Sequence, residues 1–347
     1  MTHRCVLLGI LSTTVVLGVL SARADATTPG ANGLIAFTRY RLQDKPLWSE
    51  IFVAKPDGTE LKRVSHSAKP VEDDQAHWSR DGSWIVFDRC TGEGPCTVWL
   101  VRPDGSGQRR LSDPCPSGRL PPVCADDSNP SFTPDGRHVV FQHESGHIKH
   151  GPLGDQVERS WIMTVDLNGK HPTVLRRLDG YRGDLQAPRV SPNGRLLLFE
   201  RYDSNLARPP GGQALFVVGL DGSGLRRVTP WRLAAAGADW SPDSTHILFK
   251  SSVPGGELTP GTNLYAVRAD GTKLERLTDV GSYHYVLSGS YSPDGQSIVF
   301  ATDSGATFNP NGNTFADVVT MRLGAGKLTY VTHAANLDGW PSWGTAP

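Results

Sequence analysis

The stretch Ser290-Tyr291-Ser292-Pro293-Asp294-Gly295, followed by Ile298-Val299-Phe300, contains the pattern that decides the fold. It recurs about every 50 to 58 residues, a period typical of repeat folds such as propellers. Each copy begins with two residues that we call the anchor pair, such as Ser290-Tyr291. A Ser or Thr follows, then a turn with Asp or Asn, and then an apolar segment that ends in Phe. The other copies run from His77 to Phe87, Ser131 to Phe141, Arg189 to Phe199 and Asp239 to Phe249. The chain is therefore built from one repeated unit.

A second motif follows each copy of the first. It consists of an apolar segment such as Leu264–Val267, an Asp-Gly-like turn, and a short segment that ends in an aliphatic residue and usually Ser or Thr. Aspartate and asparagine followed by glycine suit tight hairpin turns, because they tolerate positive φ. The turns are at Pro56-Asp57-Gly58, Pro103-Asp104-Gly105, Leu167-Asn168-Gly169, Leu220-Asp221-Gly222 and Ala269-Asp270-Gly271, with a degenerate copy at Gly324-Ala325-Gly326. Together the two motifs predict four short strands per unit.

The two ends of the repeat array predict how it closes. Gly33–Phe37 resembles a second strand without a first, and Trp340–Gly344 resembles a first strand without a second. Pairing them leaves no open sheet edge at the ends of the array. We therefore predict an all-β fold: a six-bladed β-propeller of four-stranded antiparallel blades, closed by one C-terminal strand joining three N-terminal strands.

The repeat resembles that of the TolB-like propellers, which are related in architecture to WD-type propellers. The resemblance rests on Trp240-Ser241-Pro242-Asp243 and its equivalents, on Ile298-Val299-Phe300, and on the Asp270-Gly271 turn that precedes Leu277-Thr278. It covers nearly all of residues 27–347, which we expect to form a single propeller domain. TolB itself carries an α/β domain before its propeller. We expect a stand-alone propeller here, so the lipoprotein-binding role of TolB is not carried over.

Residues 1–26 predict a secretory signal peptide. Arg4 precedes the apolar run Val6–Leu20, and cleavage near Ala24 or Ala26 would follow A-x-A patterns. The run is shorter than the roughly 20 residues that a membrane span needs, and we expect no span after cleavage. The protein is then exported, to the periplasm or the medium.

The cysteine count agrees with export. Four cysteines remain after the signal, and an even number in an exported chain predicts disulfides. Three pairings are possible. We expect Cys90–Cys96 and Cys115–Cys124, because each pair closes a short loop rich in glycine and proline. A metal site is the weaker interpretation, since no Cys-x-x-Cys spacing occurs.

Charge excludes one class of partner. Lys plus Arg and Asp plus Glu are both 35, so the formal net charge is +0, and loss of the signal removes Arg4 and Arg23. A nucleic-acid binder would need a basic surplus, so we expect no nucleic acid partner. Arginines recur in the last strand of the repeat, as at Arg226-Arg227, where charge discourages pairing between sheet edges. We expect a monomer.

Propeller geometry places the long loops on one face. These connect second to third strands, or one blade to the next, whereas the short Asp-Gly turns lie on the opposite face. Long loops on a rigid scaffold commonly bind ligands, although they can also be tolerated insertions. The long segments are 39–50, 89–97, 143–160, 201–214, 251–263 and 302–317, with crossings at 113–129 and 279–288.

The first strands should line the central channel. The candidates for ligand binding there and on the long-loop face share ionisable or aromatic side chains near the anchors and crossings. Arg189 and Asp239 belong to adjacent blades and are placed to pair, and a polar network in a wet channel would explain them equally well. The segments between blades carry carboxyl groups, which we call the acidic crossings: Glu72, Asp73, Asp74, Asp126, Asp127, Asp184 and Asp338. Their oxygens could hold calcium, but they could equally be solvated turn residues. The candidates are His77, Arg189, Asp239, Asp74, Asp127, Asp184, His284, Asp338 and Trp340.

His143-Glu144-Ser145-Gly146-His147 matches H-E-x-x-H. Zinc proteases need this motif on a helix, but here it follows the apolar strand Val139–Phe141 and contains Gly146. A metal site from His143, His147 and His150 is a weak alternative to a polar surface loop. No Gly-x-Ser-x-Gly nucleophile elbow occurs, so the chain lacks the mark of the peptidases that carry such a propeller.

These observations favour a non-catalytic propeller that holds a protein, peptide or glycan through its long-loop face and channel mouth. The alternative is a propeller enzyme, a polysaccharide lyase or lactonase-like hydrolase, with a metal or histidine site at the channel. His77, His284 and His333 would then be the candidates. We predict no cofactor, with calcium as the exception to test.

Overall fold

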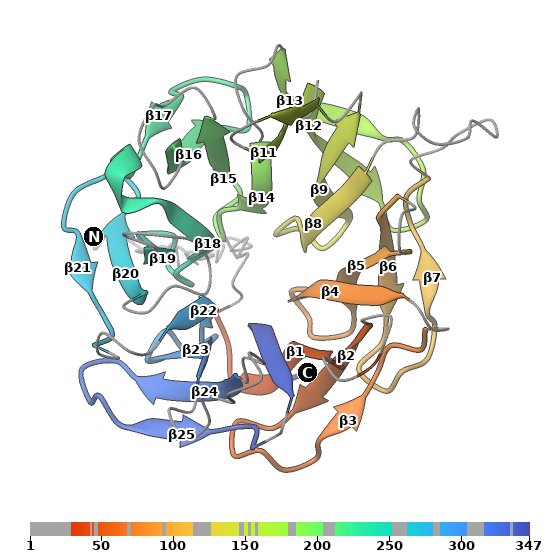
Figure 1. Cartoon of the computed structure of the whole chain (residues 1–347), viewed down its shortest axis with the longest axis vertical. Coiled ribbons are helices and arrows are strands. Elements are labelled where there is room, and N and C mark those ends of the chain that lie inside the picture. Colours follow the sequence, from red (N-terminus) through yellow and green to blue (C-terminus); the bar gives the residue numbers. More distant parts are fainter. Residues whose placement is uncertain are drawn as a thin grey trace, which may run out of the picture.

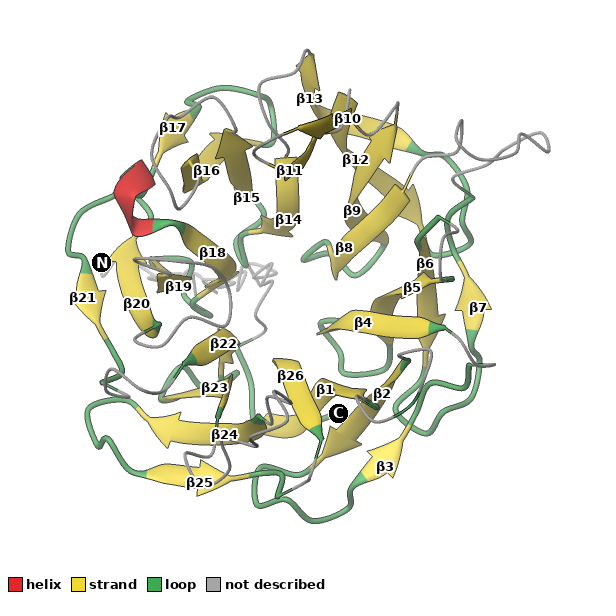
Figure 2. Ribbon diagram, viewed as in Figure 1, coloured by secondary structure: helices red, strands yellow, loops and turns green. Residues whose placement is uncertain are grey.

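The structure, a computed structural model, is a ring of six four-stranded antiparallel blades around a central axis (Figure 1). It describes residues 29–41, 44, 48–67, 71–91, 95–113, 126–145, 149–151, 154–156, 159–179, 185–203, 212–251, 262–279, 285–303, 316–333 and 336–347. Figure 2 shows that strands make up nearly all of the regular structure in the described residues, with a 3₁₀ turn, η2 (Trp231–Leu233), between the fourth and fifth blades. The predicted fold class is confirmed.

The first blade closes the ring. Its strands from the axis outward are β26 (Leu337–Thr345), β1 (Asn32–Tyr40), β2 (Ser49–Ala54) and β3 (Lys62–Arg63). β26 pairs antiparallel with β1, and Ile35 lies opposite Trp343. The predicted closure by one C-terminal strand on three N-terminal strands is confirmed.

The other blades follow in chain order, each written from the axis outward. The second is β4 (Glu72–Trp78), β5 (Ile85–Cys90), β6 (Thr97–Val101) and β7 (Arg109–Arg110), and the third is β8 (Asp126–Phe132), β9 (His138–Ser145), β12 (Arg159–Asp166) and β13 (Thr173–Asp179). The fourth is β14 (Leu185–Val190), β15 (Leu196–Asp203), β16 (Gly212–Gly219) and β17 (Arg226–Arg227). The fifth is β18 (Ala235–Trp240), β19 (His246–Ser251), β20 (Asn263–Arg268) and β21 (Glu275–Arg276), and the sixth is β22 (Val286–Tyr291), β23 (Ser297–Thr302), β24 (Asp317–Arg322) and β25 (Leu328–Tyr330). A small hairpin, β10 (Lys149–Gly151) and β11 (Gly154–Gln156), lies between β9 and β12.

Hydrogen bonds explain why the repeat has this sequence. In the turn between β18 and β19, Ser241 donates to Asp243 at 2.6 Å, and the same carboxylate accepts from the Thr245 amide at 3.0 Å. The hydroxyl at the end of the second motif also has a fixed role, because Thr278 accepts from the Leu264 amide at 2.9 Å. Each motif residue therefore holds a turn or ties an outer strand to its neighbour.

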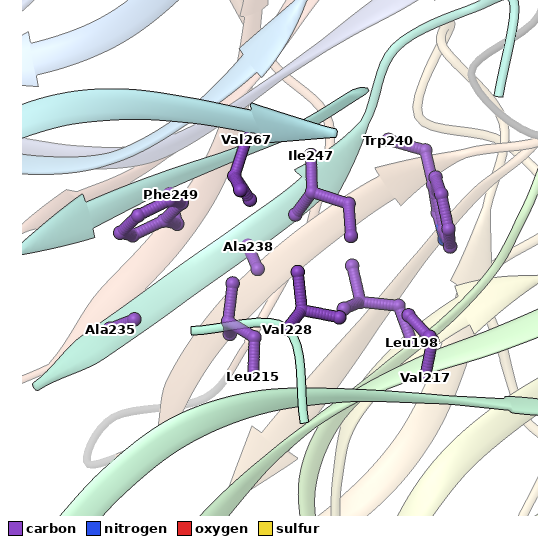
Figure 3. Close-up of a cluster of buried hydrophobic side chains, with 10 residues drawn as sticks. All are labelled: Leu198, Leu215, Val217, Val228, Ala235, Ala238, Trp240, Ile247, Phe249 and Val267. Carbon is purple, nitrogen blue, oxygen red and sulfur yellow. The ribbon is translucent and has the colours of Figure 1, made fainter. Parts of the chain in front are cut away.

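The core lies between blades rather than in one central mass. Figure 3 shows side chains of the fourth and fifth blades in contact, with Leu198 and Leu215 from one blade near Ile247 from the next. Tryptophans add ties across blades: Trp240 Nε1 donates to the Arg189 carbonyl and Trp78 Nε1 to the Ser342 carbonyl, both at 3.1 Å. These contacts fix the inner strands and hence the channel.

Candidate binding channel

A β-bulge at the same place in each inner strand shapes the channel. The pairing register shifts, for example, between Gln186 and Arg189 and between Ala236 and Asp239. Such bulges redirect side chains and are common beside functional sites. In five blades the bulge holds a residue with positive φ, and four of these are not glycine: Gln75 (55°), Asn129 (52°), Ala187 (46°), Gly237 (59°) and Trp340 (48°).

Two cavities lie along the channel. The larger, about 230 Å³, is lined by the bulge residues together with Glu200, Gln213 and Lys250. The smaller, about 30 Å³, lies beside Ser131 and Ser342. His77, Arg189 and Asp239 line both cavities. The structure therefore brings these three predicted candidates together at the place that both cavities share, which we call the constriction, and places Trp340 on the larger cavity.

Arg189 is the buried cation of this constriction. Its Nη1 donates to the carbonyl oxygens of Pro188 at 2.9 Å and Asn129 at 3.3 Å, whereas its buried Nε has no acceptor. Burial lowers the pKa of Arg189, and the charges of Asp239, Glu200 and Asp88 oppose that shift. Asp239 thus attracts Arg189 without accepting a hydrogen bond from Nε, which differs from the direct pair that the sequence suggested.

His77 is a neutral imidazole in this setting. Burial, and then the charge of Arg189, lower its pKa well below the ordinary value. A neutral ring can donate one hydrogen bond and accept another. His77 therefore adds polarity to the constriction without adding positive charge near pH 7.

A ring of buried side chains lies behind the inner strands, and sequence reasoning missed it. Each follows the Phe that ends the first motif, so the position directly after that Phe is the signal that would have found them. Glu200 accepts from the Ala238 amide at 3.2 Å and from Gln213 Nε2 at 2.9 Å, and burial raises its pKa against the opposing charges of Lys250 and Arg189. Asp88 accepts from the Asn129 amide at 2.8 Å, so both carboxyl groups hold a neighbouring bulge. The ring is Thr38, Asp88, Gln142, Glu200, Lys250 and Ala301.

Asp74, another predicted candidate, belongs to a second buried group near the channel. It accepts from Thr38 Oγ1 and from the Gln75 amide, both at 2.7 Å, and from the Tyr40 hydroxyl. Burial raises the pKa of Asp74 to about 6, although these hydrogen bonds favour the ionised form. Burial and the charge of Asp74 raise the pKa of Asp88 well above its usual range.

The acidic crossings that the structure describes lie within strands, and three of their carboxyl groups have basic side chains as partners. Asp338 binds Arg39 through two hydrogen bonds of 2.7 Å, and Asp73 binds Arg89 at 2.6 and 2.8 Å. Asp127 contacts His143 Nδ1 at 2.6 Å. Asp127 and Asp338 are therefore engaged in buried pairs rather than placed on the cavity. His143 and Glu144 also extend β9, so the strand does not end at Phe141 as expected.

The remaining predicted residues have mixed outcomes. The disulfide Cys90–Cys96 is present, at the long-loop end of β5 and β6. Cys115, Cys124, Asp184, His147, His284 and the signal segment lie outside the described residues, and for His150 only the backbone in β10 is described. Within the described ranges no three His, Cys, Asp or Glu side chains are placed to share a metal ion. Calcium and the histidine site stay predictions.

Comparisons with known proteins agree with the fold. No family model matches the chain. It is 29% identical to an uncharacterized protein of Agrobacterium fabrum over 167 residues, 48% of this chain and 51% of that one. It is 25% identical to the Tol-Pal system protein TolB of Francisella tularensis over 210 residues, 59% of this chain and 40% of TolB. The chain thus spans about half or less of these curated relatives.

A solved structure supports the same fold. The crystal structure of TolB from Acinetobacter baumannii superposes with a TM-score of 0.63 at 17% identity, over 90% of this chain and 67% of that one. Together with the six blades, this superposition shows that the chain has the TolB-like propeller fold.

Among the described residues, no helix is long and apolar enough to cross a bilayer.

Proposed function

We propose that this protein is an exported, non-catalytic binding protein that holds a protein or peptide through its long-loop face, with part of the ligand entering the channel. The observation that carries the proposal is the cavity of about 230 Å³ lined by charged and amide side chains from several blades. Residues in strained conformations line it, and such strain is concentrated at functional sites. A glycan is the alternative ligand.

The size of the cavity decides how a ligand would use it. Sites that enclose small organic ligands measure roughly 300–1,000 Å³. This cavity of about 230 Å³ is smaller, so it suits a side chain or chain end better than a whole ligand. The rest of the ligand would then lie on the long-loop face, where the Cys90–Cys96 disulfide closes one loop. That disulfide and the predicted signal peptide support export.

The test is selection of ligands on the full chain, purified after export. Displayed random heptapeptides and an array of acidic and neutral glycans are the probes, and Ser288→Trp is the variant because Ser288 lines the cavity. Leu274→Trp is the control, since Leu274 is exposed near the outer strand β21. We expect peptides whose binding falls at least tenfold in Ser288→Trp and is unchanged in Leu274→Trp.

Two results would contradict the proposal. Glycans selected in place of peptides would assign a different partner. Turnover of a polymer on the array, lost in Ser288→Trp or on chelation, would make the protein a propeller enzyme of the lyase or hydrolase kind.

A further inference from the structure

We infer that the channel binds a carboxylate of its ligand on Arg189, and that this carboxylate belongs to a polypeptide, either at its C-terminus or on an Asp or Glu side chain. The inference rests on the proposed function and names the chemistry that the channel recognises. One edge of the Arg189 guanidinium group would bind this carboxylate.

That edge, formed by Nε and Nη2, makes no hydrogen bond to a described residue, and we call it the open edge in this sense. The hydrogen bonds of Arg189 to described residues come from Nη1, which reaches the Pro188 and Asn129 carbonyls. Nε has no acceptor, and it is buried, since the whole residue is only 7% exposed. A buried donor without an acceptor is unfavourable, and Arg189 lines both channel cavities. The unpaired Nε of a residue that lines the channel therefore indicates an acceptor that the described residues do not supply.

The same protein shows what normally fills this edge. Arg39 and Arg89 are each 8% exposed, and each uses Nε and Nη2 to bind both oxygens of one aspartate. This two-bond geometry is the preferred mode of carboxylate recognition by arginine. Arg189 presents the same donors with comparable burial and lacks the carboxylate.

The acidic neighbours of Arg189 are already engaged. Glu200 accepts from the Ala238 amide and from Gln213, and Asp88 accepts from the Asn129 amide. Asp239 accepts from the Trp240 amide at 2.9 Å. Each of these bonds holds a neighbouring bulge or strand, and none of the three carboxyl groups lies within hydrogen-bond distance of Nε. An external carboxylate completes Arg189 without breaking these bonds.

The cavity limits what carries the carboxylate. About 230 Å³ corresponds to roughly seven or eight water volumes at about 30 Å³ each. A carboxyl-terminal residue or an acidic side chain fits this space. Gln75, Asn129 and Gln213 line the same cavity and can bond to peptide groups.

The experiment follows the Nε–H signal of Arg189 by ¹⁵N-edited NMR on the full exported chain, assigned with Arg189→Lys. The probes are acetate, Gly-Gly-Gly with a free C-terminus, Gly-Gly-Glu amide and glucuronate. We expect a saturable downfield shift with acetate and tighter binding of at least one peptide. Arg189→Lys keeps the charge but loses the two-donor edge, and should weaken peptide binding at least tenfold. Arg226→Lys, on the outer strand β17, should change nothing, and thermal unfolding checks that both variants fold.

The outcomes separate this inference from the proposed function. An Arg189 signal that does not move at saturating acetate and peptide overturns the inference, and so does peptide binding that Arg189→Lys leaves unchanged. In the second case the proposed function survives. Glucuronate binding more than tenfold tighter than both peptides overturns the polypeptide source of the carboxylate. A saturable acetate shift without any selected partner supports the carboxylate site and counts against the proposed function.

Discussion

Buried arginines occur in two regions of the molecule and are paired differently there. One region is the rim, by which we mean the long-loop end of the first two blades around Arg39 and Arg89, and the other is the channel constriction with Arg189. On the rim, Arg39 and Arg89 each bind an aspartate through Nε and Nη2. In the channel, Arg189 is equally buried, but its Nε has no acceptor. The rim therefore completes its charges within the fold, whereas the channel leaves one for a ligand.

Strand register explains the difference. Arg39 lies opposite Asp338 and Arg89 opposite Asp73, so each pair forms across neighbouring strands of one blade. Arg189 lies on the inner strand β14 and opposite Leu198, whose side chain has no oxygen. Arg189 lines both channel cavities, so its remaining acceptors must be peptide carbonyls, water or a ligand.

The largest expected effect comes from removing these arginines one at a time. Arg39→Met and Arg89→Met should each lower the free energy of unfolding by about 3–5 kcal/mol, because each leaves a fully buried aspartate without its partner. Arg189→Met should lower it by only about 1–2 kcal/mol, since it loses the Nη1 bonds to two carbonyls. Chemical denaturation of the three variants measures the difference.

A double variant supplies the control for that comparison. Replacing a buried ion pair by apolar residues is often neutral, so Arg89→Met with Asp73→Leu should recover most of the stability lost in Arg89→Met. Equal losses in all three single variants would mean that Arg189 is a structural ion pair like the others.

The neighbours Asp73 and Asp74 extend the comparison to pH. Asp73 has Arg89 as its partner, whereas Asp74 has only hydrogen-bond donors and lies near Tyr40, Glu72 and Asp88. Burial raises the pKa of Asp74 to about 6 in the folded protein, above the ordinary value of 3.8. Between these values the unfolded chain loses a proton that the folded chain keeps. Stability due to Asp74 should therefore fall as pH rises from about 4 to 6, and stay constant above.

Asp74→Asn isolates this effect. The difference in unfolding free energy between the variant and the original chain should move in favour of the variant by about 2 kcal/mol from pH 4 to pH 7, because one pKa unit corresponds to about 1.4 kcal/mol and the unfolded carboxyl is already partly ionised at pH 4. Denaturant titrations at both pH values give this difference, in which carboxyl groups remote from Asp74 cancel, whereas Asp88 contributes because the charge of Asp74 raises its pKa. A difference that stays constant with pH would show that folding does not raise the pKa of Asp74.

Removing the disulfide next to Arg89 tests how much this cross-link contributes to the stability of the rim. Cys90 and Cys96 are 6 residues apart and join β5 to β6. For a loop this short, the entropy of the unfolded chain predicts a stabilisation of about 2 kcal/mol. Cys90→Ser with Cys96→Ser should lose about that amount while the Arg89–Asp73 pair stays formed. The readout is the denaturation midpoint, with reduced original protein as the matched sample. No loss in the double variant would mean that the loop is already ordered without the bond.

The repeat made the fold predictable, and it also located the constriction. Turn aspartates, the Phe anchors and the split first blade are local patterns, so the blades and their closure could be read from the sequence. His77, Arg189 and Asp239 were found because they stand next to the anchors. The acidic crossings misled, because nothing local shows that Asp338 faces Arg39 across 299 positions of sequence. The ring behind the channel, with Glu200 and Lys250, looked like ordinary strand sequence.

The bulges were also beyond local patterns, because Ala187 adopts a φ of 46° that alanine seldom takes. This gives the smallest prediction, at the position two residues before Arg189. Ala187→Gly should stabilise the protein by at most about 1 kcal/mol, since relief of strain is partly offset by the greater freedom of glycine in the unfolded chain. Ala235→Gly, at a buried alanine in the regular part of β18, should instead destabilise by about 0.5–1 kcal/mol. If both variants lose stability equally, the bulge is not strained. If Ala187→Gly also weakens acetate binding, the strained residue holds Arg189 at the angle that its open edge requires.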